Sequence, residues 1–266
     1  MKNVHDSPTS FHYTDRQSAA AGYVAVMTGV ADLFDTFEGQ DWERPTDCAG
    51  WNVRDMASHL LGAQEDLMSV PGVLGRRWTG RRRYPGLSLL DAANQVQIDS
   101  HASESTAELA RSYRANIPKV ARYVSRFPRM LSGISVDKTM APRNSPLRLG
   151  YLYNVIYLRD AWMHGIDLAR ATGVPRPACG VEAMVVGQIM DDAAYQWGAE
   201  AGPEVVLSGE ISGTWQLGRP GQPARVTAAG LDLCRRLSGR RPETEVMALS
   251  ANPADVDKLA GLRILF

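Results

Sequence analysis

Residues 159–168 read RDAWMHGIDL, and they place two polar side chains on the buried face of a predicted helix. Asp160 and His164 are one helical turn apart, and both continue the apolar stripe of Ile156. A polar group on such a face needs a partner, because burying it without one is unfavourable. A carboxylate and an imidazole with this spacing can bind one metal ion together, but the same pair also arises by chance in a hydrogen-bonded core.

The quoted stretch lies in the last of four main helices predicted for the N-terminal part of the chain. That helix begins at Ser145-Pro146, an N-cap followed by proline at the first helical position, and it ends around Gly173 and Pro175. An arginine- and glycine-rich loop is expected at residues 71–86. Four helices without a strand signal predict a bundle. Periodicity and capping residues place the other three helices from Thr14 to about Gly39, from Asn52 to about Val70, and from Ser88 to Phe127, with Pro118 kinking or dividing the third.

The pattern of predicted secondary structure changes after Pro177. Short β-type runs are predicted at residues 205–207, 214–217 and 224–227, and helical patterns at 181–197, 231–237 and 253–262. The predicted fold class is therefore α+β, with a helical bundle over residues 1–175 and a small α+β domain over residues 176–266.

A second inward imidazole is predicted on the helix that begins at Asn52. His59 lies beside the apolar stripe of this helix, so it is expected to point into the bundle. Together with Asp160 and His164 it would complete a set of two histidines and one carboxylate, which leaves open positions for water or substrate. A single inward histidine is also common as a hydrogen-bonded core residue. We interpret Asp55 as a helix cap rather than as a partner of His59.

Composition limits the classes of function. The chain has 266 residues, with 29 Lys and Arg against 29 Asp and Glu, so no overall charge attracts nucleic acid or an acidic membrane. A small-molecule substrate is the expected partner, and the chain is expected to be a monomer or a homodimer. Without a run of about 18 apolar residues, no membrane span is expected. The odd number of widely spaced cysteines, Cys48, Cys179 and Cys234, argues against a disulfide framework and favours the cytoplasm.

Two segments resemble signatures of a known family. The run GWNVRDMASHL at residues 50–60 and the stretch at residues 159–168 resemble the mycothiol-dependent maleylpyruvate isomerase family, relatives of the DinB-like metal-binding bundles. The resemblance covers roughly residues 14–173. It implies a DinB-like four-helix bundle followed by a small domain similar to sterol-carrier-protein folds.

The same resemblance implies a divalent metal ion, usually zinc. In the family a histidine of the second helix and an acidic-xxx-His pair of the fourth bind the ion, which map here onto His59, Asp160 and His164. The acidic ligand is typically glutamate, whereas Asp160 is one methylene shorter. The identity of the metal is therefore left open.

The resemblance also implies residues that act on the substrate. The family uses an arginine of the C-terminal domain to hold an anionic substrate, and the Gly-Arg turn after residue 238 makes Arg240 the candidate, with Arg241 next to it. The alternative for Arg240 is a solvated cation at a helix end. A basic residue within a stretch like residues 94–101 is also typical of the family, and here it is His101.

Two further features have structural and functional interpretations. Five arginines between residues 76 and 83 could clamp carboxylates or phosphates, but a solvated loop is the favoured interpretation. Cys48 lies in a tight loop before Trp51, and we interpret it as packing rather than as a nucleophile or a fourth metal ligand.

The chain itself offers no evident nucleophile, because no cysteine lies on the helical stripes that carry the metal ligands. The resemblance implies that mycothiol supplies the reactive thiol. We therefore expect a metal-dependent enzyme that uses mycothiol as an isomerase or as a thiol S-transferase, on a small electrophilic, anionic substrate. The alternatives are a metal-dependent hydrolase and a non-catalytic metal- or ligand-binding or regulatory module.

Overall fold

A computed structural model describes residues 14–137, 147–176, 178–240 and 253–265, and it divides into two compact units. One unit comprises Asp15–Ser132 and Leu152–Cys179, and we call it the helical unit. The other draws on the described parts of residues 1–14, 133–151 and 180–266, and we call it the mixed unit. The boundary predicted between residues 175 and 176 stays a prediction.

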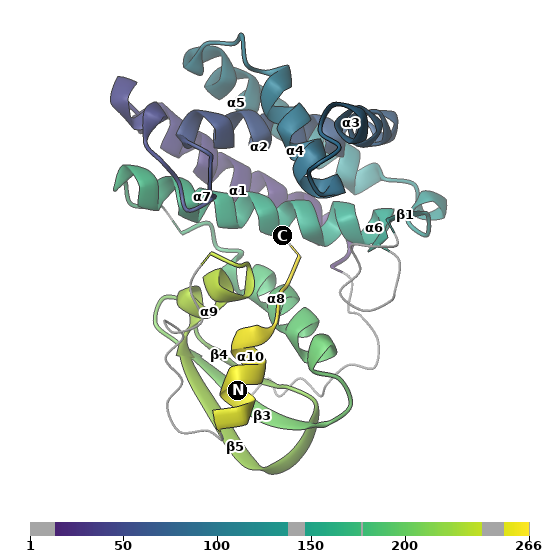
Figure 1. The fold of residues 1–266 in the computed structure, drawn as a ribbon, viewed down its shortest axis with the longest axis vertical. Coiled ribbons are helices and arrows are strands. Elements are labelled where there is room, and N and C mark those ends of the chain that lie inside the picture. The colour runs from purple at the N-terminus through teal and green to yellow at the C-terminus, as the bar shows by residue number, and fades with distance from the viewer. Residues whose placement is uncertain (1–13, 138–146, 177, 241–252, 266) are drawn as a thin grey trace. The chain divides into compact units, whose positions relative to one another are not determined.

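Four long helices form the core of the helical unit (Figure 1). They are α1 (Arg16–Thr36), α2 (Val53–Leu67), α5 (Thr106–Arg126) and α7 (Tyr157–Thr172). Both α1 and α2 pack against α5 and α7. Their inward side chains, such as Tyr23, Met56 and Trp162, are fully buried, and this apolar burial holds the helices together. The predicted bundle and the α+β class are confirmed.

The predicted arginine-rich loop is wrong, because this segment forms helix α3 (Val70–Arg83). The Ser69 side chain caps it by accepting a hydrogen bond from the Gly72 amide, and proline is tolerated in the first helical turn. Gly80 lets α3 approach α4 (Leu89–Ser100), because a Cβ there would lie 2.6 Å from the Ala92 carbonyl oxygen. The glycines that suggested a loop serve close helix packing instead.

The helical stretch predicted from Ser88 to Phe127 is two helices, and Pro118 does not divide them. The break lies between the C-cap of α4 at His101 and the N-cap of α5 at Ser105. Ser105 and Glu108 form a capping box that starts the second helix. Pro118 lies inside α5, which continues to Arg126.

The last long helix is preceded by a change in helical geometry. Residues Leu149–Tyr151 form α6, Leu152–Ile156 form a π-helical turn, η3, and α7 follows. The predicted start at Ser145-Pro146 lies outside the described residues. Gly173 ends α7 with a φ of 76°, as predicted for a helix C-terminus.

Short elements complete the part of the chain up to residue 148. They include two 3-10 turns, η1 (Gly39–Glu43) and η2 (Arg129–Leu131). Residues without a predicted strand form the antiparallel pair β1 (Ser135–Asp137) and β2 (Leu147–Arg148). None of the helices that the structure describes is both long and apolar enough to cross a membrane.

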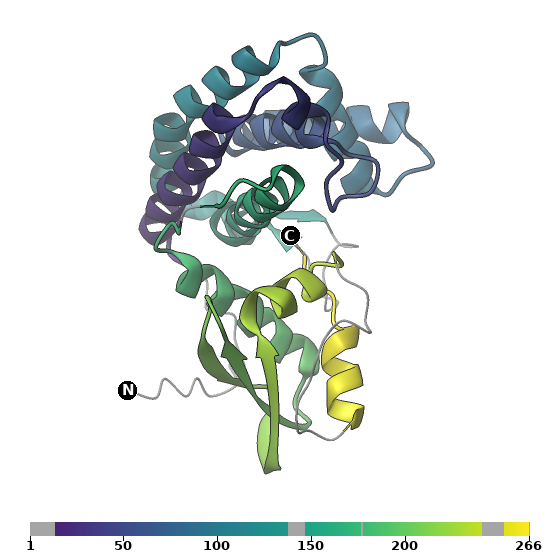
Figure 2. The same ribbon diagram turned by 90° about the vertical axis from the view of Figure 1, so that its left-hand side faces the viewer.

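The C-terminal part of the mixed unit is a three-stranded sheet with helices. Helix α8 (Glu182–Trp197) precedes β3 (Ala201–Ser208), which lies between β4 (Gly213–Gln216) and β5 (Arg219–Ala229). The central strand is antiparallel to β4 and parallel to β5. Helix α9 (Gly230–Leu237) follows, and it contacts α10 (Pro253–Gly261), yellow in Figure 2. These elements match the helices and strands predicted after residue 177.

Candidate metal centre

The three predicted ligands meet inside the helical unit. Asp160 and His164 come from α7 and His59 comes from α2. One Asp160 oxygen lies 3.2 Å from His59 Nε2, and the other lies 3.2 Å from His164 Nε2. One ligand atom from each residue lies within 4.8 Å of the others. Adjacent ligand atoms of a tetrahedral zinc site with bonds of about 2.0–2.1 Å are about 3.3–3.4 Å apart, so these spacings fit a single ion.

Local sequence fixes the start of the helix that carries His59. The Asn52 side chain accepts a hydrogen bond from the Asp55 amide, and the Asp55 carboxylate accepts one from the Asn52 amide. This reciprocal cap confirms the interpretation of Asp55. It sets the first turn of α2, and His59 follows on the next turn toward the core, where it is 3% exposed.

Both imidazoles direct the same nitrogen toward Asp160. His164 Nδ1 donates to Asp167 Oδ2 at 3.1 Å, and His59 Nδ1 donates to Gln97 Oε1 at 2.7 Å. Since the Nδ1 atoms hold protons in these bonds, the Nε2 atoms are the ones available to a metal ion. The donor set of two imidazole nitrogens and one carboxylate therefore fits a divalent cation.

The electrostatics of the site also favour a cation. Burial alone would raise the pKa of Asp160, but His164 and His59 outweigh it and hold that pKa well below its usual range. Burial disfavours the charged form of His164, yet the carboxylates of Asp160 and Asp167 hold its pKa well above its usual range. The carboxylate thus stays ionised and stabilises positive charge beside it, which a metal ion can supply in place of a proton.

An aromatic side chain that the sequence did not predict lies against the histidines. The Trp51 ring centroid is 4.9 Å from that of His59 and 6.0 Å from that of His164. Its loop is held by the Trp51 carbonyl oxygen, which accepts from the amide and hydroxyl of Thr46. The position of Trp51 directly before the Asn52 cap was the available signal. The indole covers one side of the ligand set with apolar surface.

Cys48 makes polar contacts that the packing interpretation did not include. Its Sγ lies 3.8 Å from Asp167 Oδ2 and 4.0 Å from His164 Nδ1. It therefore lies on the Nδ1 side of His164, whereas Asp160 lies on the Nε2 side. Cys48, His164 and Asp167 could themselves hold a cation, but through a different nitrogen from the one that faces Asp160.

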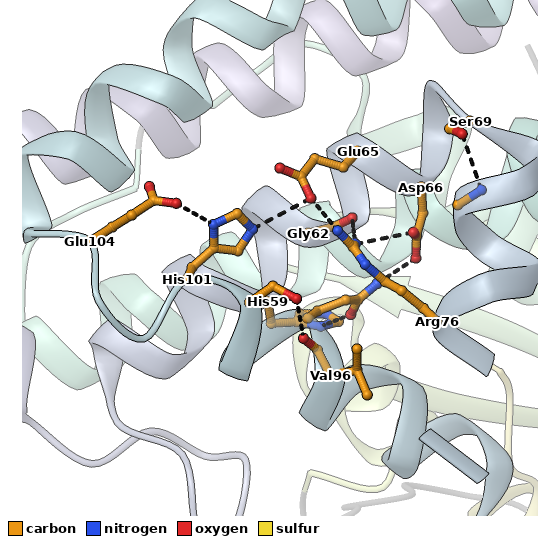
Figure 3. Close-up of polar contacts among 12 residues, drawn as sticks. His59, Gly62, Glu65, Asp66, Ser69, Arg76, Val96, His101 and Glu104 are labelled. Carbon is orange, nitrogen blue, oxygen red and sulfur yellow. Dashed lines mark hydrogen bonds and ion pairs between the residues drawn. The ribbon is translucent and has the colours of Figure 1, made fainter. Parts of the chain in front are cut away.

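His101 lies in the helical unit and is engaged by two carboxylates (Figure 3). Its Nδ1 is 2.7 Å from Glu104 and its Nε2 is 3.5 Å from Glu65. Burial lowers the pKa of His101, but these two carboxylates outweigh burial and raise it above its usual value. Among the described residues, the ligand atoms that lie together at this site come from His59, Asp160 and His164. His101 is not part of this set.

Arg240 lies in the mixed unit, in the turn after α9. Gly239 has a φ of 83°, and the Arg240 amide donates to the Arg235 carbonyl oxygen, which closes the end of the helix. The predicted Gly-Arg turn is therefore present. The side chain of Arg240 is half-buried. Arg241 lies outside the described residues.

The arginine cluster belongs to α3 and is not a single anion clamp. Arg76 is half-buried and pairs with Glu65 and Asp66. Arg82 stacks over Trp78 at 4.7 Å, and Arg83 pairs with Asp99 at 3.0 Å. The pairs of Arg76 and Arg83 link α3 to α2 and α4, whereas Arg82 and Trp78 both lie on α3. Neither the clamp nor the solvated loop had predicted these links.

Fold and donor set define the class of protein: a helical bundle with a buried candidate metal site, on a chain that also carries a small α+β unit. Residues 23–169 match the family model described as mycothiol maleylpyruvate isomerase N-terminal domain, and the chain belongs to this family. The matched region contains His59, Asp160 and His164. The resemblance inferred from the two short signatures is confirmed.

Two relatives and two solved structures are similar to this chain. Two uncharacterised proteins from strains of Mycobacterium tuberculosis are each 27% identical over 215 residues, covering 75% of this chain and 76% of theirs. Crystal structures of the mycothiol-dependent maleylpyruvate isomerase and of a point mutant superpose with a TM-score of 0.57 at 12% identity. Each comparison covers 92% of this chain and 97% of the other. This likeness shows a shared fold.

Proposed function

We propose that this protein is a divalent-metal-dependent enzyme of the cytoplasm that uses mycothiol as a co-substrate. It acts as an isomerase or as a thiol S-transferase on a small, electrophilic, anionic substrate. The observation that carries the proposal is the buried set of His59, Asp160 and His164 in a chain of the mycothiol maleylpyruvate isomerase family.

Two imidazole nitrogens and one carboxylate would hold the ion, with zinc as the proposed metal. Three protein ligands leave a coordination position for an external ligand. A cation held by the three ligands would lower the pKa of a thiol at this open position, which makes the sulfur a strong nucleophile near neutral pH. The remaining contributions come from the chain's own residues.

Those residues hold the ligands and exclude water. Gln97 and Asp167 keep a proton on Nδ1 of the two histidines, and the negative charge of Asp160 offsets the positive charge of the ion. Trp51 covers the two rings on one side. In such a desolvated setting electrostatic interactions are stronger than in water.

The nucleophile is proposed to come from outside the protein. The Cys48 thiol lies beside Asp167 on the Nδ1 side of the His164 ring, whereas Asp160 lies on the Nε2 side. Cys234 is buried in the mixed unit. None of the described cysteines belongs to the set of His59, Asp160 and His164, so the reactive thiol is proposed to come from outside.

The chemistry balances without a redox step. The thiolate sulfur adds to one carbon of an electron-poor double bond, and the electron pair of that bond moves toward the activating carbonyl. Rotation about the resulting single bond and expulsion of the thiolate give the other geometric isomer and return the thiol. An S-transferase would instead protonate the adduct, or lose a different leaving group, and keep the carbon–sulfur bond.

Arg240 and His101 are proposed as residues that bind and polarise the anionic substrate. Arginine can bind a carboxylate through two parallel hydrogen bonds. The half-buried Arg240, held by the turn at Gly239, and the cationic tendency of His101 support these assignments.

Metal content and thiol ionisation test the proposal. The purified chain is expected to contain one zinc ion per molecule, His164→Gln is expected to lose it, and His101→Gln, another buried histidine of the helical unit, is expected to keep it. Ultraviolet titration of added mycothiol is expected to show a lowered thiol pKa with the metal-loaded protein and not with His164→Gln. Absence of metal would refute the metal-dependent function. An unchanged thiol pKa with zinc bound would favour a metal-dependent hydrolase or a non-catalytic module.

A further inference from the structure

A chain of buried side chains leads away from the candidate metal site. His59 Nδ1 lies 2.7 Å from Gln97 Oε1, and Gln97 Nε2 lies 2.7 Å from Asp66 Oδ2. Asp66 in turn accepts from Arg76 Nη1 at 3.1 Å and from the Tyr157 hydroxyl at 3.3 Å. Figure 3 shows the far end of this series of side chains, where Arg76 approaches Asp66 and Glu65.

We propose that Asp66 and Gln97 are positioning residues that fix the tautomer of His59, so that Nε2 is the nitrogen presented to the metal ion. The inference rests on the proposed metal site and concerns residues that contact neither the ion nor the substrate. We call Asp66, Gln97 and His59 the tautomer relay.

The direction of the relay follows from what each group can donate. An ionised carboxylate only accepts, so Asp66 binds the NH₂ end of the Gln97 amide. The amide oxygen is then turned toward His59, and because this oxygen also only accepts, Nδ1 must carry the proton. Nε2, which lies 3.2 Å from Asp160 Oδ2, is then the nitrogen whose lone pair would face a bound ion.

Because Asp66 and Gln97 are buried, the direction of these hydrogen bonds cannot easily reverse. Asp66 is 4% exposed and Gln97 is 2% exposed, so water does not offer the amide an alternative set of partners. Burial holds the pKa of Asp66 above its usual value, and Arg76, Gln97 and Tyr157 offset only part of this shift by stabilising the carboxylate. Arg76 thus has a role that the surface-loop interpretation could not provide.

A glycine allows the relay to form between two helices. His59 and Gly62 lie on the same face of α2, and α4 carries Gln97 across that face. A Cβ at Gly62 would lie 2.6 Å from the Gln97 Cβ. Any larger residue there would push Gln97 away from His59.

The alternative is that these residues only pack the bundle. Zinc affinity distinguishes the two roles, because a packing defect lowers the free energy of unfolding without selecting a nitrogen of His59. Gln97→Leu removes both hydrogen bonds of the amide. The matched control is Gln64→Leu. Gln64 lies on α2 and is buried like Gln97, but its amide donates to the Tyr113 carbonyl oxygen, outside the relay.

Competition with a chromogenic chelator measures the zinc Kd of the full chain. Gln97→Leu is expected to raise this Kd about 10- to 100-fold, the usual effect of losing a hydrogen-bond partner of a metal-bound histidine. Gln64→Leu is expected to change it by less than about 3-fold. Circular dichroism verifies that each variant is folded at the temperature used.

A rescue experiment tests the direction of the relay. Asp66→Asn lets the Gln97 amide turn over, and Gln97→Glu places two carboxylates against each other. The double variant D66N/Q97E reverses the donor and the acceptor of the 66–97 pair, since the amide introduced at position 66 can donate to the carboxylate introduced at position 97, and it keeps an acceptor toward His59. It is therefore expected to bind zinc more tightly than either single variant.

The outcomes separate this inference from the function on which it rests. If the wild-type chain binds no metal, the proposed function fails. If the wild-type chain binds zinc but Gln97→Leu matches Gln64→Leu in Kd, the tautomer relay alone is refuted. The relay is equally refuted if D66N/Q97E binds zinc no more tightly than the tighter-binding of the two single variants.

Discussion

Replacing Asp160 with asparagine removes the only charge of the ligand set while keeping its shape. Each Asp160 oxygen is 3.2 Å from a histidine Nε2, in a site where all three side chains are buried. At an effective dielectric constant of about 20, a unit positive charge at this distance interacts with the carboxylate by about 5 kcal/mol. At about 1.4 kcal/mol per factor of ten, this interaction corresponds to between three and four powers of ten in affinity.

The actual loss of affinity is smaller, because the amide oxygen can still act as a neutral ligand and is easier to desolvate than a carboxylate. We therefore expect Asp160→Asn to weaken zinc binding by about 10²- to 10⁴-fold. Chelator competition and elemental analysis measure the change. Asp192→Asn is the control, since Asp192 is a buried carboxylate of the mixed unit that accepts from the Tyr151 hydroxyl. Zinc affinity equal to that of the wild type would refute charge-assisted ligation by Asp160.

Three further outcomes are expected. Zinc at about 100 times its Kd should raise the free energy of unfolding by about 2.7 kcal/mol, so a melting temperature that does not respond to zinc or to a chelator would contradict a structured site. The raised pKa of His101 means that its charged form stabilises the fold fully below the usual pKa of about 6.5, and that this stability is lost as pH rises through the folded pKa. The difference in urea stability between the wild type and His101→Gln should therefore shrink from about pH 6 to about pH 9, and a growing difference would reverse the assigned sign. Arg240→Lys should raise KM for an anionic substrate while zinc content and melting temperature stay unchanged, because lysine lacks the two-pronged guanidinium, and an unchanged KM would remove Arg240 from substrate binding.

Features that depend on near neighbours in the chain could be predicted from the sequence. The four-residue spacing of Asp160 and His164 places both on one helical face wherever that helix packs. The Asn52 and Asp55 cap and the Gly173 stop are likewise local, because a cap involves residues within one turn. Helices and their inner faces follow from such rules, whereas the assignment of His59, Asp160 and His164 to one ligand set was what the family resemblance implied.

Local rules failed where a residue's role is set by another helix. The glycines of α3 suggested a loop because propensity cannot represent the close approach of Gly80 to Ala92. Arg76 was assigned to a solvated surface because the sequence does not show which charges it meets. Its partners, Glu65 and Asp66, lie on a different helix, α2. Tertiary contacts outweighed the intrinsic preference in both cases.

The sequence by itself therefore determined which side chains point into the bundle, and the tertiary structure decided what each of them meets there. Gln97 is 38 residues from His59, and Cys48 is 116 residues from His164. No periodicity relates such positions, since their proximity depends on how α2, α4 and α7 pack and on where Gly62 permits close contact. The nitrogen that each histidine presents is fixed by these distant partners, because a ring that donates through Nδ1 keeps its lone pair on Nε2.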